Sequence, residues 1–149
     1  MIVIDAAAIR GVELGDAESV AELSGQLGYA ASTAEMEERT RWVIAHADEQ
    51  VALVACVDGL VVGWVEAAVV HHLQSAPHVL IGGLVVQEGV RGLGVGRKLC
   101  AAVEDWTRDK RMDVVRVTSR STREAAHRFY LGDGYVLTKN SAVFEKVLP

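Results

Sequence analysis

The chain has 149 residues, of which half are hydrophobic and only 5% aromatic, and its formal net charge is −5. This length and composition predict one α/β domain packed mainly by alanine, valine and leucine. The acidic balance and the lack of a basic stripe argue against a nucleic-acid-binding protein. No apolar run approaches the length that spans a bilayer.

The N-terminal segment has no basic stretch ahead of a long apolar one, so we expect no signal peptide. Cys56 and Cys100 are the two cysteines, and each lies in an apolar pattern. We therefore expect both thiols to be reduced and in or near the core of a cytoplasmic protein.

The first third of the chain predicts a strand and two helices. The strand is expected over residues 9–13, and Asp16 is placed to cap a helix over residues 17–27 that stops at Gly28. Ser32 and Glu35 have the spacing of a capping box, which opens a second helix that runs to about residue 47.

The next segments read as a hairpin followed by a loop. Residues 51–57 and 60–72 are strand-like and flank Asp58 and Gly59, a pair that favours a two-residue turn. Residues 73–78 contain Pro77, which predicts a loop.

A strand, a glycine-rich loop and a helix follow in that order. Residues 79–86 are uncharged and rich in β-branched side chains, as in a buried strand. Gly92, Gly94 and Gly96 then let backbone N–H groups converge where a helix begins, an arrangement that binds anions. The helix has one apolar stripe, made of Val95, Leu99, Ala102, Val103 and Trp106.

Several kinds of glycine loop have to be compared. A P-loop needs Gly-Lys followed by serine or threonine, whereas Gly96 is followed by Arg97 and Lys98. A dinucleotide-binding loop reads G-x-G-x-x-G, and this chain has G-x-G-x-G instead. A cradle for an acyl-CoA and a purely structural turn both remain.

The last third predicts a strand, a helix and two closing strands. A buried strand is expected over residues 114–118, and Ser121 and Glu124 again have capping-box spacing. The helix that they open is expected to end near residues 132–134, and strands follow at 135–138 and 142–147.

Two local motifs and the order of elements resemble the GNAT N-acetyltransferase superfamily. Arg91, Gly94 and Gly96 match its pattern [Q/R]-x-x-G-x-[G/A] between a strand and a helix. Ala126 and Tyr130 belong to a second match, AHRFY followed by Gly-Tyr at 134–135. The resemblance covers essentially the whole chain and implies a single domain over residues 1–149. Its α/β (α+β) fold would have a mixed, mostly antiparallel sheet, splayed fourth and fifth strands, and helices on both faces.

The resemblance also implies acetyl-CoA as cosubstrate. Its pantetheine arm would pair with the edge of the fourth strand, which by position comprises Leu84, Val85 and Val86. Its pyrophosphate would lie on the loop and helix start formed by Arg91, Gly92, Leu93, Gly94, Val95, Gly96 and Arg97. Arg123 stands where the family often has asparagine, so it either reaches a CoA phosphate or is a solvated residue.

Catalytic roles follow from the same resemblance. Tyr130 matches the residue that protonates the departing thiolate, although a tyrosine packed in the core is the other interpretation. The N–H of Val86 matches the donor to the oxyanion. Many relatives have a glutamate on the fourth strand where this chain has Ile81, Gly82 and Gly83.

Glu66 is the leading substitute for the general base, because it interrupts an apolar strand and apolar surroundings raise the pKa of a carboxyl group. A histidine, His71 or His72, or a water molecule is the alternative base, and a solvated or paired role for Glu66 also stays open. No residues have the spacing of metal ligands, so we expect no metal.

The expected activity is direct attack of a primary amine, most simply of a small molecule, on the acetyl-CoA thioester. Acetylation of a protein N-terminus or lysine is one alternative, and a non-catalytic acyl-CoA sensor is another. We expect neither nucleic acid nor membrane as a partner, and a homodimer through the last strands is compatible with the family.

Overall fold

The computed structural model describes residues 7–91, 93–120 and 122–149. Within them a five-stranded sheet has the order β1-β2-β3-β4-β5, antiparallel except for the parallel β4–β5 pair. The strands are β1 (Ala8–Gly11), β2 (Gln50–Val57), β3 (Leu60–His72), β4 (Ser75–Val86) and β5 (Val115–Val117). The helices are α1 (Ala17–Gly25), α2 (Thr33–Ala45), α3 (Val95–Asp109) and α4 (Glu124–Gly132). The predicted mixed, mostly antiparallel sheet is confirmed.

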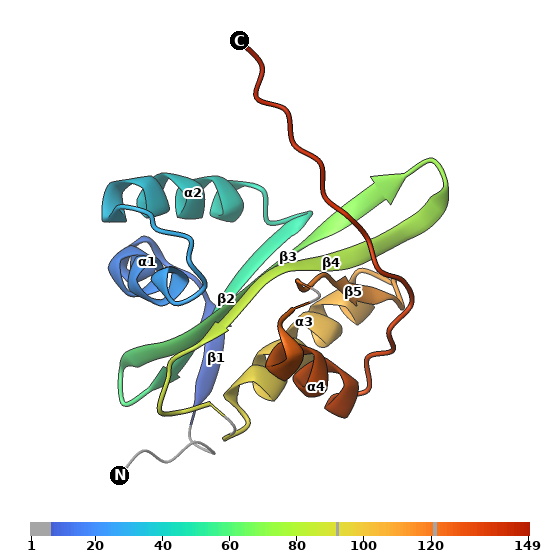
Figure 1. The fold of residues 1–149 in the computed structure, drawn as a ribbon. Helices are drawn as coiled ribbons and strands as arrows, with labels where there is room; N and C mark the ends of the chain where they lie inside the picture. Colours follow the sequence, from blue (N-terminus) through green and yellow to red (C-terminus); the bar gives the residue numbers. More distant parts are fainter. Residues whose placement is uncertain (1–6, 92, 121) are drawn as a thin grey trace. The chain divides into compact units, whose positions relative to one another are not determined.

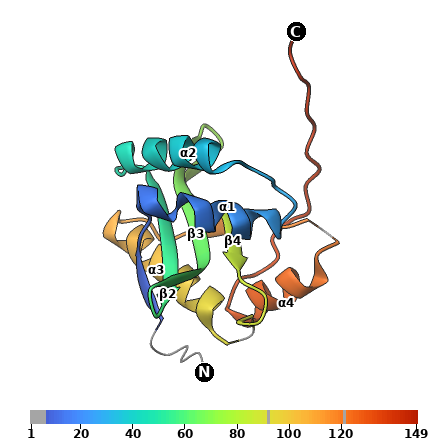
Figure 2. The same cartoon turned by 90° about the vertical axis from the view of Figure 1, so that its left-hand side faces the viewer.

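The chain divides into two compact units, Met1–Thr118 and Ser119–Pro149. The first unit holds the sheet and α1 to α3, and the second holds α4 and the C-terminal segment. In the first unit α1 and α2 cover one face of the sheet and α3 covers the other (Figures 1 and 2). Helices therefore lie on both faces, as predicted.

Helix α3 is packed against the sheet through one face. Val95, Leu99, Cys100 and Val103 are all buried against the sheet. The helix approaches β3 closely at Gly63, where an added Cβ would lie 3.3 Å from Leu99 Cδ1 and 3.0 Å from the carbonyl oxygen of Val85. The predicted apolar stripe is confirmed at its centre, while Ala102 and Trp106, at its edge, are half-buried.

Helix α2 lies with α1 on the other face of the sheet. It is far more exposed than α3. Its capping box is confirmed, because the N–H of Glu35 donates to Ser32 Oγ at 3.1 Å and the N–H of Ser32 donates to Glu35 Oε1 at 3.3 Å. Thr40 is its one buried residue. The helix ends at Ala45, before the predicted residue 47, which lies in a turn.

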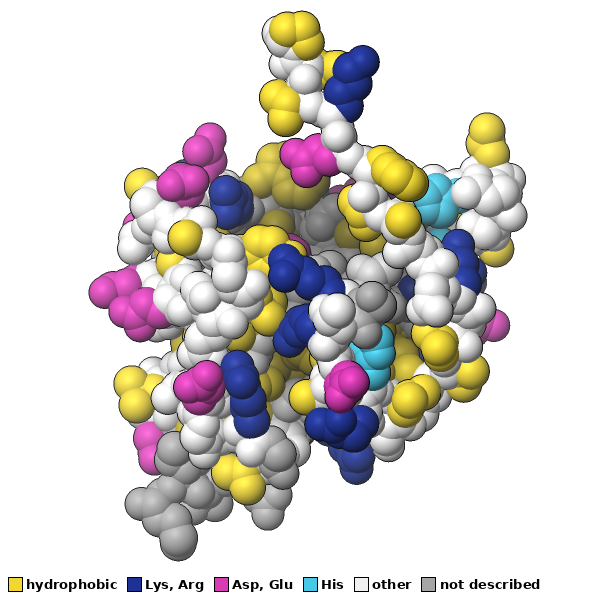
Figure 3. Space-filling model, viewed as in Figure 1, with side chains coloured by type: hydrophobic (Ala, Val, Ile, Leu, Met, Phe, Trp, Pro, Cys, Tyr) yellow, Lys and Arg dark blue, Asp and Glu magenta, His cyan; other side chains and the backbone are white. Residues whose placement is uncertain are grey.

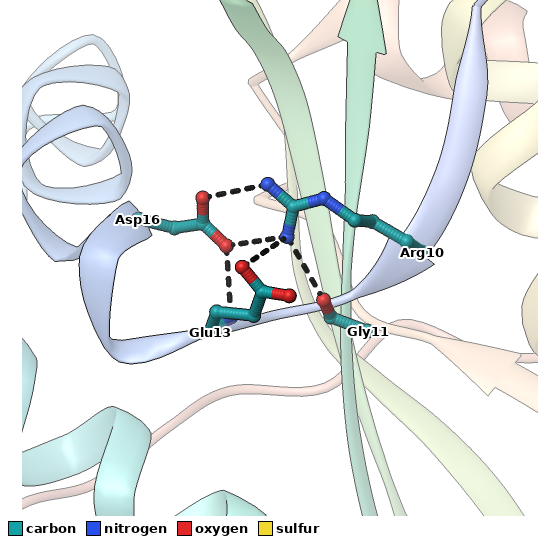
Figure 4. Close-up of polar contacts among 4 residues, drawn as sticks. All are labelled: Arg10, Gly11, Glu13 and Asp16. Atoms are coloured by element: carbon teal, nitrogen blue, oxygen red, sulfur yellow. Dashed lines mark hydrogen bonds and ion pairs between the residues drawn. The ribbon is translucent and has the colours of Figure 1, made fainter. Parts of the chain in front are cut away.

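The start of α1 differs from the prediction that Asp16 caps it with its side chain. The chain leaves β1 at Gly11, forms a 3-10 turn over Leu14–Asp16, and enters α1 without a side-chain cap. Arg10 Nη1 and Nη2 donate to the Asp16 carboxylate at 2.7 and 2.9 Å, and the N–H of Glu13 donates at 2.8 Å (Figure 4). A guanidinium outcompetes a neutral helix N–H for this carboxylate.

Two tight turns build the antiparallel part of the sheet. The predicted two-residue turn at Asp58 and Gly59 is confirmed, and both residues have positive φ, at 50° and 79°. The predicted loop at residues 73–78 is wrong, because β4 begins at Ser75. Pro77 is tolerated because the register shifts there, with Val70 opposite His78 and His72 opposite Ser75, so that a bulge removes the need for its missing N–H.

The two predicted closing strands, at 135–138 and 142–147, are absent from the structure. Residues 135–149 have no regular secondary structure, and Val143 and Phe144 are 94% and 93% exposed. Apolar side chains of this segment stand out at the top of Figure 3. The alternation of apolar residues fits a strand, but a strand forms only where a neighbouring ladder satisfies its backbone.

The second unit contains the predicted fourth helix. Helix α4 runs from Glu124 to Gly132, and Gly134 has a positive φ of 89° just after it. The residue at its N-cap is Arg123, and the predicted cap, Ser121, lies outside the described residues. No helix in the described part of the chain is long and apolar enough to cross a membrane.

Candidate active site

The first component of the site is the outer edge of β4. Strand β5 pairs with β4 only from Val79 to Ile81, while β4 continues to Val86. This divergence is the splay expected of the fourth and fifth strands. The N–H of Gln87 donates to the carbonyl of Val62 at 2.8 Å, so Val86, one residue earlier, turns its N–H and C=O away from β3. Leu84 lies in the same phase, and both residues present backbone polar groups at the edge.

The second component is the loop that leads into α3. Gly94 is the N-cap of α3 and has φ = 93°, a left-handed conformation that glycine adopts without strain. A Cβ added there would meet nothing within 4 Å, so the backbone angle rather than crowding requires glycine. Val95 and Gly96 are buried while Leu93 is exposed, and Gly92 lies outside the described residues.

The first turn of α3 suits an anion. Its N–H groups lack partners within the helix, and they lie at the positive end of the helix dipole. No acidic side chain occupies this turn, and Arg97 follows in it. The β4 edge suits the amide-bearing arm of a CoA molecule. The N-terminus of α3 suits its pyrophosphate.

Arg91 makes contacts that the sequence did not predict. Its Nε donates to the carbonyl oxygen of Val86 at 3.0 Å, and its Nη2 donates to Gln26 Oε1 at 3.1 Å. Its Nη1 lies 3.9 Å from Glu88 Oε1. The guanidinium therefore joins the loop to the end of β4 and to the C-terminal end of α1.

Glu66 on β3 lies over a bulge in β4. Glu66 is opposite Gly83 and Ala67 is opposite Ile81, so Gly82 is the extra residue. A Cβ added to Gly82 would lie 3.2 Å from Glu66 Oε1. The carboxylate thus lies above the segment of β4 that has no acidic residue of its own.

The surroundings of Glu66 alter its acidity. Its side chain keeps an exposed surface, but the protein crowded around the carboxyl group displaces part of its hydration. This desolvation raises the pKa of Glu66 above its ordinary value. The direction agrees with the prediction from its apolar strand.

Trp64 is a neighbour that sequence reasoning did not place in the site. A Cβ added to Gly83 would lie 2.7 Å from Trp64 Cη2, so the indole ring covers that glycine. Its Nε1 is buried and has no hydrogen-bond partner among the described residues. The available signal was the period-two alternation, which puts Trp64 and Glu66 on one face of β3.

Tyr130 and Arg123 lie in the second unit, on α4. The Tyr130 ring is half-buried and makes edge-on contacts with Phe129 and Tyr135, at centroid distances of 5.2 and 5.8 Å. Arg123 is exposed at the N-cap of the helix, and its side chain makes no capping bond.

The histidines that were alternative bases lie on the projecting β3–β4 hairpin. His71 Nε2 is 3.0 Å from Glu49 Oε1, and the His72 ring lies 5.9 Å from the His78 ring. Among the described residues no group of three or more histidine, cysteine or acidic side chains could hold a metal ion.

Comparisons with known proteins agree with this geometry. The model of the acetyltransferase (GNAT) family matches residues 17–135. An aminoglycoside N(6′)-acetyltransferase type 1 of Stenotrophomonas maltophilia is 30% identical over 151 aligned positions, which cover 99% of this chain and 97% of that protein.

Two solved structures of one aminoglycoside N-acetyltransferase, AAC(6′)-Iy, share the fold. Its complex with CoA has a TM-score of 0.83 at 22% identity and covers 94% of both chains. Its complex with the bisubstrate analogue CoA-S-monomethyl-acetylneamine has a TM-score of 0.82 at 21% identity and covers 95% of this chain and 99% of that one.

The chain therefore belongs to the acetyltransferase (GNAT) family. It is an N-acetyltransferase. At these identities the solved structures establish the fold, while the choice of substrate depends on the residues of this chain.

Proposed function

We propose that this N-acetyltransferase transfers the acetyl group of acetyl-CoA to a primary amine of a small molecule, and that aminoglycosides are the substrate class to test first. The observation that carries the proposal is the open edge of β4 running into the N-terminus of α3 within one unit. The full-length likeness to an aminoglycoside N(6′)-acetyltransferase supports the substrate class.

In this proposal the backbone of the chain binds the cosubstrate. The backbone of the edge residues Leu84, Val85 and Val86 forms hydrogen bonds with the amides of the pantetheine arm, as it would with an additional β-strand. The amides of residues 91–97, with the positive end of α3, bind the pyrophosphate. Arg123, at the N-cap of α4, is the candidate for a contact with a CoA phosphate by its position in the family pattern alone.

Three groups carry the proposed direct attack. Glu66 removes a proton from the ammonium group, directly or through water, and its raised pKa makes it a stronger base than an ordinary glutamate. The amine nitrogen then bonds to the thioester carbon, and the N–H of Val86 donates to the oxyanion that forms. The tetrahedral intermediate then collapses: the C–S bond breaks and the Tyr130 phenol protonates the departing thiolate. The amide nitrogen releases its remaining extra proton to water, from which the Tyr130 phenolate is reprotonated.

The test measures acetyl-CoA turnover with a panel of aminoglycosides, simple alkylamines and peptides. We expect turnover with aminoglycosides that have a primary 6′-amine. Glu66→Gln should lower kcat by about 10²–10⁴-fold and remove the acidic limb of the pH–rate profile, because general base catalysis is worth that much. Glu145→Gln, which changes an exposed carboxylate of the C-terminal segment, is the control.

Other results would contradict the proposal in distinct ways. Turnover of peptides alone would assign the enzyme to protein amines. Binding of acetyl-CoA without turnover of any amine would favour a sensor. Tyr130→Phe with an unchanged rate across the pH range would remove the phenol from the mechanism.

A further inference from the structure

The peptide unit between Val86 and Gln87 is held at both of its polar atoms. On one side the N–H of Gln87 donates to the carbonyl of Val62 on β3, at 2.8 Å. On the other side the C=O of Val86 accepts from Arg91 Nε, at 3.0 Å. An exposed strand end would otherwise be free to fray, so this pair of bonds fixes the last residue of β4.

The same guanidinium is held by α1. The Nε and Nη2 atoms lie on one edge of the planar guanidinium group of Arg91. Through that edge the guanidinium donates one hydrogen bond to the carbonyl of Val86 and one to the side-chain oxygen of Gln26. Gln26 is the C-cap of α1, and its own N–H bonds the carbonyls of Leu23 and Ser24. Two of the five guanidinium N–H donors are used in this way, and Nη1 lies 3.9 Å from Glu88 Oε1.

We propose that Arg91 is a positioning residue for acetyl transfer and that Gln26 is its partner, which together fix the Val86 backbone at the end of β4. The proposal rests on the proposed function, in which the N–H of Val86 stabilises the oxyanion. An oxyanion donor contributes only when it is already oriented, because reorientation during the reaction would consume the stabilisation. The bond to Gln26 also ties that orientation to α1, the helix that precedes the exposed loop at residues 29–32.

A charge role and a positioning role for Arg91 predict different effects of Arg91→Lys. Lysine keeps the positive charge but has no planar edge that reaches two acceptors. If Arg91 acted only by charge, Arg91→Lys would leave both KM for acetyl-CoA and kcat near their wild-type values. If it positions Val86, kcat falls while KM stays within about twofold.

Gln26 gives an independent pair of variants. Gln26→Ala removes the acceptor, and Gln26→Glu keeps an oxygen at that place and adds an ion pair. We expect Gln26→Ala to lower kcat by about three- to tenfold, as loss of one charged hydrogen bond at an exposed site does, and Gln26→Glu to keep the wild-type value. In the Arg91→Lys background Gln26→Ala should add little, because the two residues act as one unit. Gln74→Ala, an exposed glutamine in the β3–β4 turn, is the control.

A second measurement does not depend on turnover. Hydrogen exchange of the Gln87 amide reports how firmly the 86–87 peptide is held, and acetyl-CoA affinity is measured by calorimetry on the same variants. Gln26→Ala and Arg91→Lys should speed that exchange several-fold, while Gln26→Glu should not. Unchanged Gln87 exchange in both, or a wild-type kcat for Arg91→Lys, would overturn the proposal. Absence of turnover in the wild-type protein, with Gln87 exchange altered as expected, would instead overturn the proposed function alone.

Discussion

Helices α3 and α2 lie on opposite faces of one sheet and are held to it very differently. Helix α3 buries a run of apolar side chains and approaches β3 at a glycine, so it is locked against the strands beneath it. Helix α2 buries Thr40 alone and leaves Trp42 52% exposed. The helix proposed to bind the cosubstrate is therefore fixed by buried apolar side chains, whereas α2, on the other face, buries little side-chain surface.

This difference suggests a division of labour. The cosubstrate is the same in every catalytic cycle, and a rigid helix terminus, as proposed for α3, would bind it without the entropic cost of ordering the backbone. Acceptor amines vary in size and charge, and a helix with little buried surface can shift to accommodate them at small cost. Recognition of the acceptor is thus expected to depend on the α1/α2 face.

The largest expected effect comes from truncating the packed helix. Leu99 is fully buried, so Leu99→Ala should lower the free energy of unfolding by about 2–5 kcal/mol. Ile44→Ala on α2, where the side chain is 46% exposed, should cost less than about 0.5 kcal/mol. Urea denaturation of both variants measures the contrast, and equal losses would show that α2 is as firmly packed as α3.

A smaller effect tests how closely side chains are packed around Glu66, on the face of the sheet that α1 and α2 cover. Gly83→Ala would place a Cβ 2.7 Å from the Trp64 ring, and the ring has to move, which should cost about 1–3 kcal/mol of stability. Gly82→Ala meets the mobile end of Glu66 at 3.2 Å, so it should cost less stability and perturb the pH–rate profile more. If both variants have wild-type stability, Trp64 is not confined as the structure indicates.

The smallest effect concerns the ion pair at the start of α1. Arg10 and the backbone of Glu13 bond the Asp16 carboxylate and lower its pKa below the ordinary range. A lowered folded pKa contributes stability above the unfolded pKa, about 3.9, and that contribution is lost as the pH falls through the folded pKa. Asp16→Asn should therefore cost about 1–2 kcal/mol at pH 7 and progressively less below pH 4.

Unfolding free energies from pH 7 down to pH 3 would show this convergence of the two proteins. Glu13→Gln is the control, because its carboxylate is 72% exposed and 3.7 Å from Arg10. A gap between wild type and Asp16→Asn that stays constant into acid would contradict the assigned pKa.

Local signals made much of the fold predictable. The Asp58–Gly59 turn needs positive φ at both residues, and few other pairs supply it, so the sequence identified it directly. The capping box at Ser32 and the centre of the α3 stripe depend on spacing along a single helix, which the sequence also contains. Features that depend on one element alone were the ones recovered.

Features that depend on a partner elsewhere in the chain were missed. Asp16 was predicted to cap α1, but it is engaged by Arg10 of the preceding strand. The 73–78 segment was predicted to be a loop because a proline argues against a strand, and the bulge that admits Pro77 is a property of the pair of strands. The predicted closing strands have the alternation of apolar and polar residues that suits a strand. That alternation does not supply a neighbouring strand to form backbone hydrogen bonds with.

The candidate site divides in the same way. Glu66 was proposed from its own strand, because one carboxylate in an apolar run is conspicuous, and its predicted raised pKa is what the structure bears out. The bonds from Arg91 to Val86 and Gln26 join residues up to 65 positions apart, and no spacing rule reports them. The roles of Tyr130 and Arg123 remain predictions, and Tyr130→Phe tests the first of them.

The turn between β2 and β3 has a chemical consequence for how the protein ages. Asp-Gly is a dipeptide in which the glycine leaves the following amide nitrogen unshielded, so that it can attack the aspartyl side chain and form a succinimide. Reopening of that ring to isoaspartate adds a methylene group to the main chain. Both residues of the turn are exposed, and the strand that follows it carries Trp64 and Glu66. Isoaspartate formation at Asp58 would thus alter the turn that leads directly into the strand of Glu66.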